Sequence, residues 1–167
     1  GDHLLWMPRS SRYVSVRSLG GDLVPTGTLE PVAETPLDFR VGFAALEDTI
    51  NALDGGLDHC LVVDDNLLPQ GPLGKEGKGK KEEDPVAAVL RSPKSKIQLT
   101  LRTSQPGVQV YTSNSLSGPF PFDKHRAVAL EAQHFPDSPN RPEFPDTTLR
   151  PGYTFHEHAS FHFSHFT

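Results

Sequence analysis

Residues 86–112, VAAVLRSPKSKIQLTLRTSQPGVQVYT, decide the fold. They contain short apolar or alternating runs at 86–90, 97–101 and 108–112, separated by Pro, Gly and Ser. Runs of this length, rich in Val, Ile, Leu and Tyr and bounded by turn residues, predict β-strands. Successive short strands without intervening helical patterns are typical of an all-β sandwich or barrel.

The same pattern recurs over the rest of the chain. Further strands are expected at 4–7, 13–16, 60–63, 126–131 and 153–166. Only Phe43 to Ala52 has apolar residues at a spacing of three to four, which predicts one short connecting helix. We therefore expect a single all-β domain over residues 1–167, because 167 residues suit one domain.

Composition and charge exclude several classes of function. The 16 Lys and Arg against 21 Asp and Glu leave a net charge of -5, which offers nucleic acid no basic surface. No apolar run approaches the roughly 18 residues of a membrane span. Cys60 is the only cysteine, which excludes disulfide frameworks and fits a reducing compartment such as the cytoplasm. We expect neither a nucleic-acid nor a membrane partner.

Residues 71–84 form a charged segment in which Leu73 is the only large apolar residue. Its lysines and acids are equal in number, so it carries little net charge. Such a segment cannot bury enough apolar surface to offset its ordering entropy. It is expected to be a flexible loop between two strands; a lysine-rich binding patch is the alternative.

Polar residues at strand ends are the candidates for chemistry. Glu131 follows an apolar run. It could act as a general base, or it could simply be the first polar residue after a strand. Asp58 follows a glycine-rich turn, where with His59 it could hold a hydroxylated ligand or merely cap the turn. Alternation places Gln109 and Tyr111 on one face, which suits sugar recognition but also an ordinary solvent face.

The C-terminal run contains several histidines. In an extended strand, His156, His158 and His162 would share one face, and imidazoles at this spacing can ligate zinc or copper. No clear carboxylate joins them, and Phe161 and Phe163 are expected to face the core. A terminal strand with a polar face is therefore favoured, and no metal site is predicted.

Taken together, several motifs resemble the aldose 1-epimerase (galactose mutarotase) family, in the order found there. They are TPLDFR at 35–40, GLDH at 56–59, PGVQVYT at 106–112 with Asn114, LEAQHFPDSPN at 130–140, and FP at 144–145 followed by LRPG at 149–152. VPTG at 24–27 and Asp2-His3 extend the match toward the N-terminus. The resemblance covers nearly the whole chain apart from the charged segment.

The resemblance implies a fold and a mechanism. The family fold is a large antiparallel β-supersandwich about twice this length, and the chain resembles its C-terminal half. In the family a glutamate, here Glu131, removes the anomeric proton of a hexose while a histidine protonates the ring oxygen. Asp58 and Gln109 match contacts to sugar hydroxyls. No cofactor or metal is implied.

The departures from the family pattern concern the acid. The family's acid histidine belongs to a segment upstream of Gly1, and His59 and His125 match other positions. Ser113 stands where the family favours glycine. We therefore expect this chain alone to be inactive and to need an N-terminal half of the same protein. The sequence does not begin with methionine, which is typical of a piece of a longer protein.

Three hypotheses follow for function. The first is an aldose 1-epimerase homologue that interconverts the anomers of hexoses such as galactose and glucose. The second is a non-catalytic carbohydrate-binding or vestigial half-protein, and the third is a histidine-rich metal-binding module. If the first holds, Asp58, Gln109 and Glu131 are expected to converge on one concave face.

Overall fold

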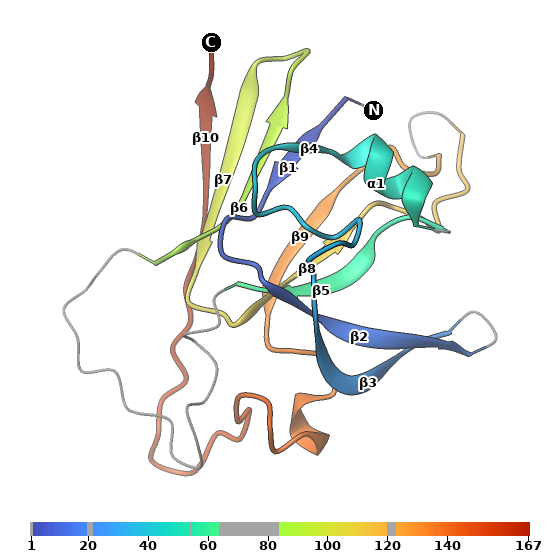
Figure 1. Ribbon diagram of the computed structural model, residues 1–167. Helices are drawn as coiled ribbons and strands as arrows, with labels where there is room; N and C mark the ends of the chain where they lie inside the picture. Colours follow the sequence, from blue (N-terminus) through green and yellow to red (C-terminus); the bar gives the residue numbers. More distant parts are fainter. Residues whose placement is uncertain (1, 20–21, 54, 64–83, 120–122) are drawn as a thin grey trace.

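The computed structural model describes residues 2–19, 22–53, 55–63, 84–119 and 123–167. Apart from Asp84, the charged segment 71–84 lies outside the described residues, so the expectation of a flexible loop there is untested. The described chain forms two five-stranded sheets in which each mapped strand pair is antiparallel (Figure 1). The all-β prediction is confirmed.

The first sheet, called sheet A, has the strand order β10-β7-β6-β1-β4. Its strands are β1 (Leu4–Trp6), β4 (Ala44–Ala45), β6 (Val86–Ser92), β7 (Ile97–Thr103) and β10 (Ala159–His165). The β6–β7 hairpin comes directly from the stretch that decides the fold. Its register pairs Leu90 with Leu99, so the apolar positions of both strands share one face.

The second sheet, called sheet B, has the strand order β3-β2-β5-β8-β9. Its strands are β2 (Arg12–Leu19), β3 (Asp22–Pro31), β5 (Asp58–Val62), β8 (Gly107–Tyr111) and β9 (Ala129–Gln133). β8 belongs to this sheet although it follows β7 directly, because the turn at Gln105 to Gly107 carries the chain from one sheet to the other. Sheet B positions the candidate site residues.

The core lies between the sheets. Leu5, Leu61, Leu101, Val108 and Val110 are fully buried in one cluster. Because side chains alternate along a strand, burial of Val108 and Val110 turns Gln109 and Tyr111 to the opposite face of sheet B. That outer face has a smaller cluster of its own, which consists of Val14, Cys60, Val62, Phe135 and Phe144.

The predicted helix is present but shorter than expected. α1 covers Leu46–Ala52, because Ala44 and Ala45 pair with β1 instead of joining the helix. A 3₁₀ turn, η2 (Ser138–Asn140), follows β9. In the described ranges, no helix has the length and apolar character needed to cross a bilayer.

Two strand predictions need correction. β3 was not expected, because Pro25 and Gly27 in its sequence are typical of a turn. It is an edge strand, where a proline costs no ladder hydrogen bond on the solvent side, and its pairing with β2 shifts register between Val14 and Val16. At the C-terminus only β10 is a strand, and residues 153–158 form irregular backbone.

The phenylalanines of β10 are not buried. Phe161 and Phe163 pair with Leu101 and Leu99, so they lie on the core face of sheet A as predicted. They are nevertheless 50% and 67% exposed. β10 is the outermost strand of sheet A, and sheet B lies toward the opposite edge of sheet A, so it does not cover these rings (Figure 1). The prediction was right about the face but wrong about burial.

Candidate functional site

Three of the predicted site residues lie on the outer face of sheet B. Gln109 pairs directly with Cys60 of β5 and with Glu131 of β9, so the three side chains share a face. Asp58 lies two residues from Cys60 and points the same way. The structure thus brings together Asp58, Gln109 and Glu131 from three adjacent strands, which the sequence separates widely.

Asp58 and Gln109 form a direct hydrogen bond. The Gln109 Nε2 donates to Asp58 Oδ1 over 2.7 Å. The other amide atom of Gln109, Oε1, is buried and has no hydrogen-bond partner among the described residues. Because an unsatisfied buried acceptor costs about 1–3 kcal/mol, this oxygen is suited to a donor supplied by a ligand hydroxyl.

A cavity of about 150 Å³ opens beside this pair. Asp58 and Gln109 line it together with Cys60, Pro136 and the apolar residues Val14, Val16, Leu23 and Pro25 of β2 and β3. Glu131 is exposed and does not line the cavity, and it lies in the middle of β9 rather than at a strand end. The arrangement is a polar pair against an apolar wall, with a carboxylate on the neighbouring strand.

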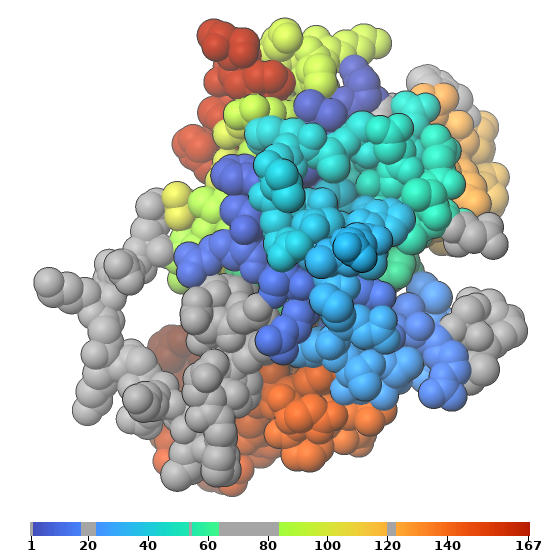
Figure 2. All heavy atoms as spheres, in the orientation of Figure 1, coloured from blue at the N-terminus to red at the C-terminus, as the bar shows by residue number. Residues whose placement is uncertain are grey.

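The segment after β9 folds back over this face and supplies Pro136. The rings of Phe135 and Phe144 meet edge to face at 5.2 Å, and Arg141 Nε donates to Asp137 Oδ2 over 2.8 Å. The Arg141 guanidinium packs on β3 at Gly27, where a Cβ would lie 2.3 Å from Arg141 Cζ. Figure 2 shows the orange atoms of this segment packed against the blue atoms of β2 and β3.

The turn before β5 sets the position of Asp58. Leu57 N donates to Thr112 Oγ1 over 2.9 Å, and Asn114 Nδ2 donates to Leu57 O over 2.7 Å. Gly56 has a φ of +91°, in the region that favours glycine. The motif residues Thr112 and Asn114 thus hold the chain at Leu57 and orient the aspartate beside it.

We expect Gly56→Ala to destabilise the protein more than Gly55→Ala. Both glycines have positive φ, which costs an alanine about 1–2 kcal/mol. A Cβ at Gly56 would also lie 2.4 Å from Asn114 Oδ1, whereas nothing lies within 4 Å of one at Gly55. Overpacking adds about 1–3 kcal/mol. Urea denaturation measures the difference, and equal losses would contradict the role of the Asn114 contact.

His59 does not assist Asp58 as the sequence suggested. It alternates with Asp58 and Cys60 along β5, so its ring lies on the opposite face, edge-on to Tyr13 at 5.9 Å. Its Nδ1 accepts a hydrogen bond from the Asp58 backbone N–H over 3.2 Å. Burial lowers the pKa of His59, with the nearby Asp58 charge opposing the shift. His59 is therefore a structural residue on the core side of sheet B.

The lowered pKa of His59 predicts a loss of stability on acidification. Below the ordinary histidine pKa near 6.5 the unfolded chain binds a proton that the folded chain resists, so the free energy of unfolding falls until the folded pKa is reached. Between about pH 7 and about pH 5.5, wild type should lose more stability than His59→Gln in urea titrations. Parallel losses in the two proteins would show that His59 is not the group responsible.

Neither Cys60 nor the C-terminal histidines form a candidate site in the part of the chain that the structure describes. Burial raises the pKa of the Cys60 thiol to about 12, so it is no nucleophile at neutral pH. His156 and His158 precede β10 instead of sharing a strand face with His162. Among the described residues, no group of three or more His, Cys, Asp or Glu side chains is placed to hold a metal ion.

Ser113 stands where the family favours glycine, and the structure explains how a serine fits there. Its φ is +51°, a conformation that a glycine adopts without strain. Its side chain offsets part of the cost, because Oγ donates to Ala127 O over 3.1 Å and accepts from Ala127 N over 3.0 Å. The serine therefore preserves the loop that follows β8.

Comparison with known proteins gives consistent relatives. The sequence is 35% identical to galactose mutarotase of Mus musculus over 148 residues, or 85% of this chain. It is 33% identical to aldose 1-epimerase of Escherichia coli (strain K12) over 151 residues, or 84% of this chain. The aligned regions are 39% and 40% of those proteins, so the chain spans about two fifths of their length.

The fold comparison agrees. The crystal structure of an aldose epimerase homologue from C. elegans superposes with a TM-score of 0.79 at 27% identity, over 99% of this chain and 46% of that one. The sequence model described as aldose 1-epimerase matches residues 9–162. On these matches, over nearly its whole length, the chain belongs to the aldose 1-epimerase family.

Proposed function

We propose that this chain is the base-bearing part of an aldose 1-epimerase that interconverts the α and β anomers of hexoses such as galactose and glucose. The observation that carries the proposal is the grouping of Asp58, Gln109 and Glu131 on one face of sheet B. These residues occupy the motif positions matched to the family's sugar contacts and base. Free, buried Cys60 fits a cytoplasmic location.

In this proposal each residue has a separate task. Asp58 and Gln109 hold sugar hydroxyls, since a carboxylate accepts and an amide both donates and accepts. Glu131 removes the proton from the anomeric hydroxyl, and the electron pair left on that oxygen forms the carbonyl as the C1–O5 bond breaks. Rotation about C1–C2 and reclosure give the other anomer, and the proton returns on closure.

The ring oxygen needs a proton as it leaves, and that acid is assigned outside this chain. His59 lies on the opposite face of sheet B, and His125 Nδ1 lies 3.0 Å from the Thr112 carbonyl oxygen. Neither is placed as a partner of Glu131. The acid is therefore proposed to come from the part that the longer relatives have in addition, as the family resemblance implies.

A second function, sugar binding without catalysis, is supported by the position of Glu131. This carboxylate lies outside the cavity that Asp58 and Gln109 line. A vestigial half-protein could keep the Asp58–Gln109 pair for binding alone. Catalysis remains the leading proposal because Glu131 is retained beside that pair.

A fusion protein tests the proposal. In the Mus musculus galactose mutarotase, this chain replaces the stretch that it matches, and the mutarotation of fresh α-galactose and α-glucose is followed by polarimetry. Acceleration above buffer, lost in the fusion with Asp58→Ala, supports an epimerase. A folded fusion that binds galactose without accelerating mutarotation supports the binding module instead.

A further inference from the structure

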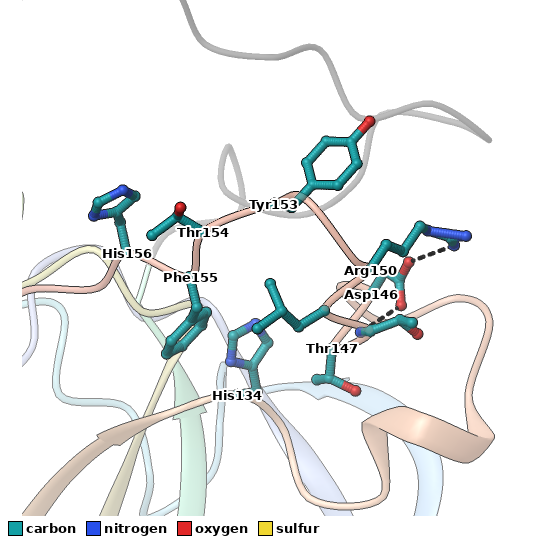
Figure 3. Close-up of a pocket in the computed structure, with 10 residues that line it drawn as sticks. His134, Asp146, Thr147, Arg150, Tyr153, Thr154, Phe155 and His156 are labelled. Carbon is teal, nitrogen blue, oxygen red and sulfur yellow. Dashed lines mark hydrogen bonds and ion pairs between the residues drawn. The ribbon is translucent and has the colours of Figure 1, made fainter.

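A second cavity lies away from the Asp58–Gln109 pair. It has a volume of about 650 Å³ and is lined by His134, residues 146–150 and residues 153–156. It shares no lining residue with the smaller cavity beside Gln109. Figure 3 shows His134, at the end of β9, on one side and the segment from Asp146 to His156 arching over it. Its volume falls within the range of small-molecule sites.

The cavity exposes apolar side chains that a folded protein usually covers. Leu149, Tyr153 and Phe155 are 58%, 71% and 56% exposed, although they lie within one short segment. The Phe155 ring stands 6.5 Å from the His134 ring at a tilt of 37°, and both residues line the cavity (Figure 3). Clustered exposed apolar groups of this kind mark binding surfaces more often than isolated ones do.

Among the residues that line the cavity, Asp146 and Arg150 form a loose ion pair. Asp146 Oδ2 accepts from Arg150 Nη2 at 3.4 Å, and both side chains are 65% exposed. Asp146 Oδ1 accepts the Thr148 backbone N–H over 2.9 Å, which fixes the carboxylate. A long, exposed ion pair contributes little to stability, so both groups are able to bond a ligand.

The combination selects a class of ligand. Asp146 and Arg150 cancel in charge, so the site offers a phosphate or other anion no net attraction. A purely apolar ligand would leave both charges unpaired. A neutral pyranose fits, because its C–H face can pack on an aromatic ring while adjacent hydroxyls donate to a carboxylate and accept from a guanidinium.

We propose that the cavity bounded by His134, Asp146, Arg150 and Tyr153 is a second carbohydrate site, which binds a neutral hexopyranose separately from the Asp58–Gln109–Glu131 face. The Tyr153 ring packs against the C–H face of the sugar, and Asp146 and Arg150 form hydrogen bonds with two adjacent hydroxyls. The site does not depend on the epimerase proposal, since it shares no residue with that face.

The test is a titration of the whole 167-residue chain, followed by amide chemical shifts in NMR. Methyl β-galactopyranoside is the probe because its anomeric centre is blocked, and lactose tests whether a glycan residue is preferred to a monosaccharide. Shifts are expected at residues 146–156. Tyr153→Ala and Asp146→Ala should each weaken binding roughly tenfold, as expected for loss of one ring contact or one bidentate hydrogen bond.

A matched variant and the location of the shifts separate this site from the proposed active face. Phe163→Ala removes a comparably exposed ring outside the cavity and should leave the affinity unchanged. Shifts confined to residues near Gln109, or none at millimolar sugar, would overturn the proposal. So would binding that Tyr153→Ala leaves intact, or inorganic phosphate binding in preference to the sugar. Since Tyr153 is exposed, a folded variant is expected.

Discussion

Glu131→Gln should lower the mutarotation rate of the fusion protein by about 10²–10⁴-fold, the usual contribution of a general base. Glutamine keeps the size of the side chain and its ability to hydrogen-bond, but it cannot take up the anomeric proton. Because Glu131 is exposed and pairs with Gln109 across the strands, the substitution should leave folding and sugar binding nearly unchanged. The expected result is a fall in kcat with little change in KM.

Glu143→Gln is the matched control, because it makes the same chemical change at an exposed glutamate in the segment after β9. Polarimetry at several galactose concentrations separates kcat from KM for both variants. A Glu131→Gln fusion that retained full activity would disprove the base assignment. Equal losses in the two variants would point to a general effect of charge.

The sequence predicted sheet content well where strands are short and their alternation is clear. β6, β7 and β8 were expected within two residues of their observed bounds, since Pro, Gly and Ser mark their ends. The shared face of Gln109 and Tyr111 followed from the same period of two. Family motifs then pointed to Asp58 and Glu131, which no local pattern could have distinguished from ordinary polar residues.

What was missed depends on packing between distant segments. β3 reads as a turn, so the apolar wall that Leu23 and Pro25 add to the small cavity was not foreseen. The side taken by His59 was also misjudged, because β5 begins at Asp58 rather than at Cys60. The large cavity required the folded arrangement of residues 146–156 over His134, which no spacing rule encodes.

The second large effect concerns this chain by itself. We expect its mutarotation of α-galactose to be indistinguishable from buffer. If the acid comes from outside this chain, as proposed, the ring oxygen of the sugar must leave unprotonated here, at a cost of about 10²–10⁴-fold. In this proposal the sugar would also be held only by the face that carries Asp58 and Gln109, and the loss of positioning would remove a further share of the rate.

The measurement compares the chain alone, the fusion protein and buffer at matched concentration, after circular dichroism has shown β-structure in both proteins. Brisk turnover by the chain alone would mean that its own residues supply the acid. His134 would then be the first candidate, because it follows β9 and lies three residues from Glu131. A His134→Gln variant that abolished that turnover would assign the acid to this strand end instead of to a segment outside this chain, and would leave Glu131 as the base.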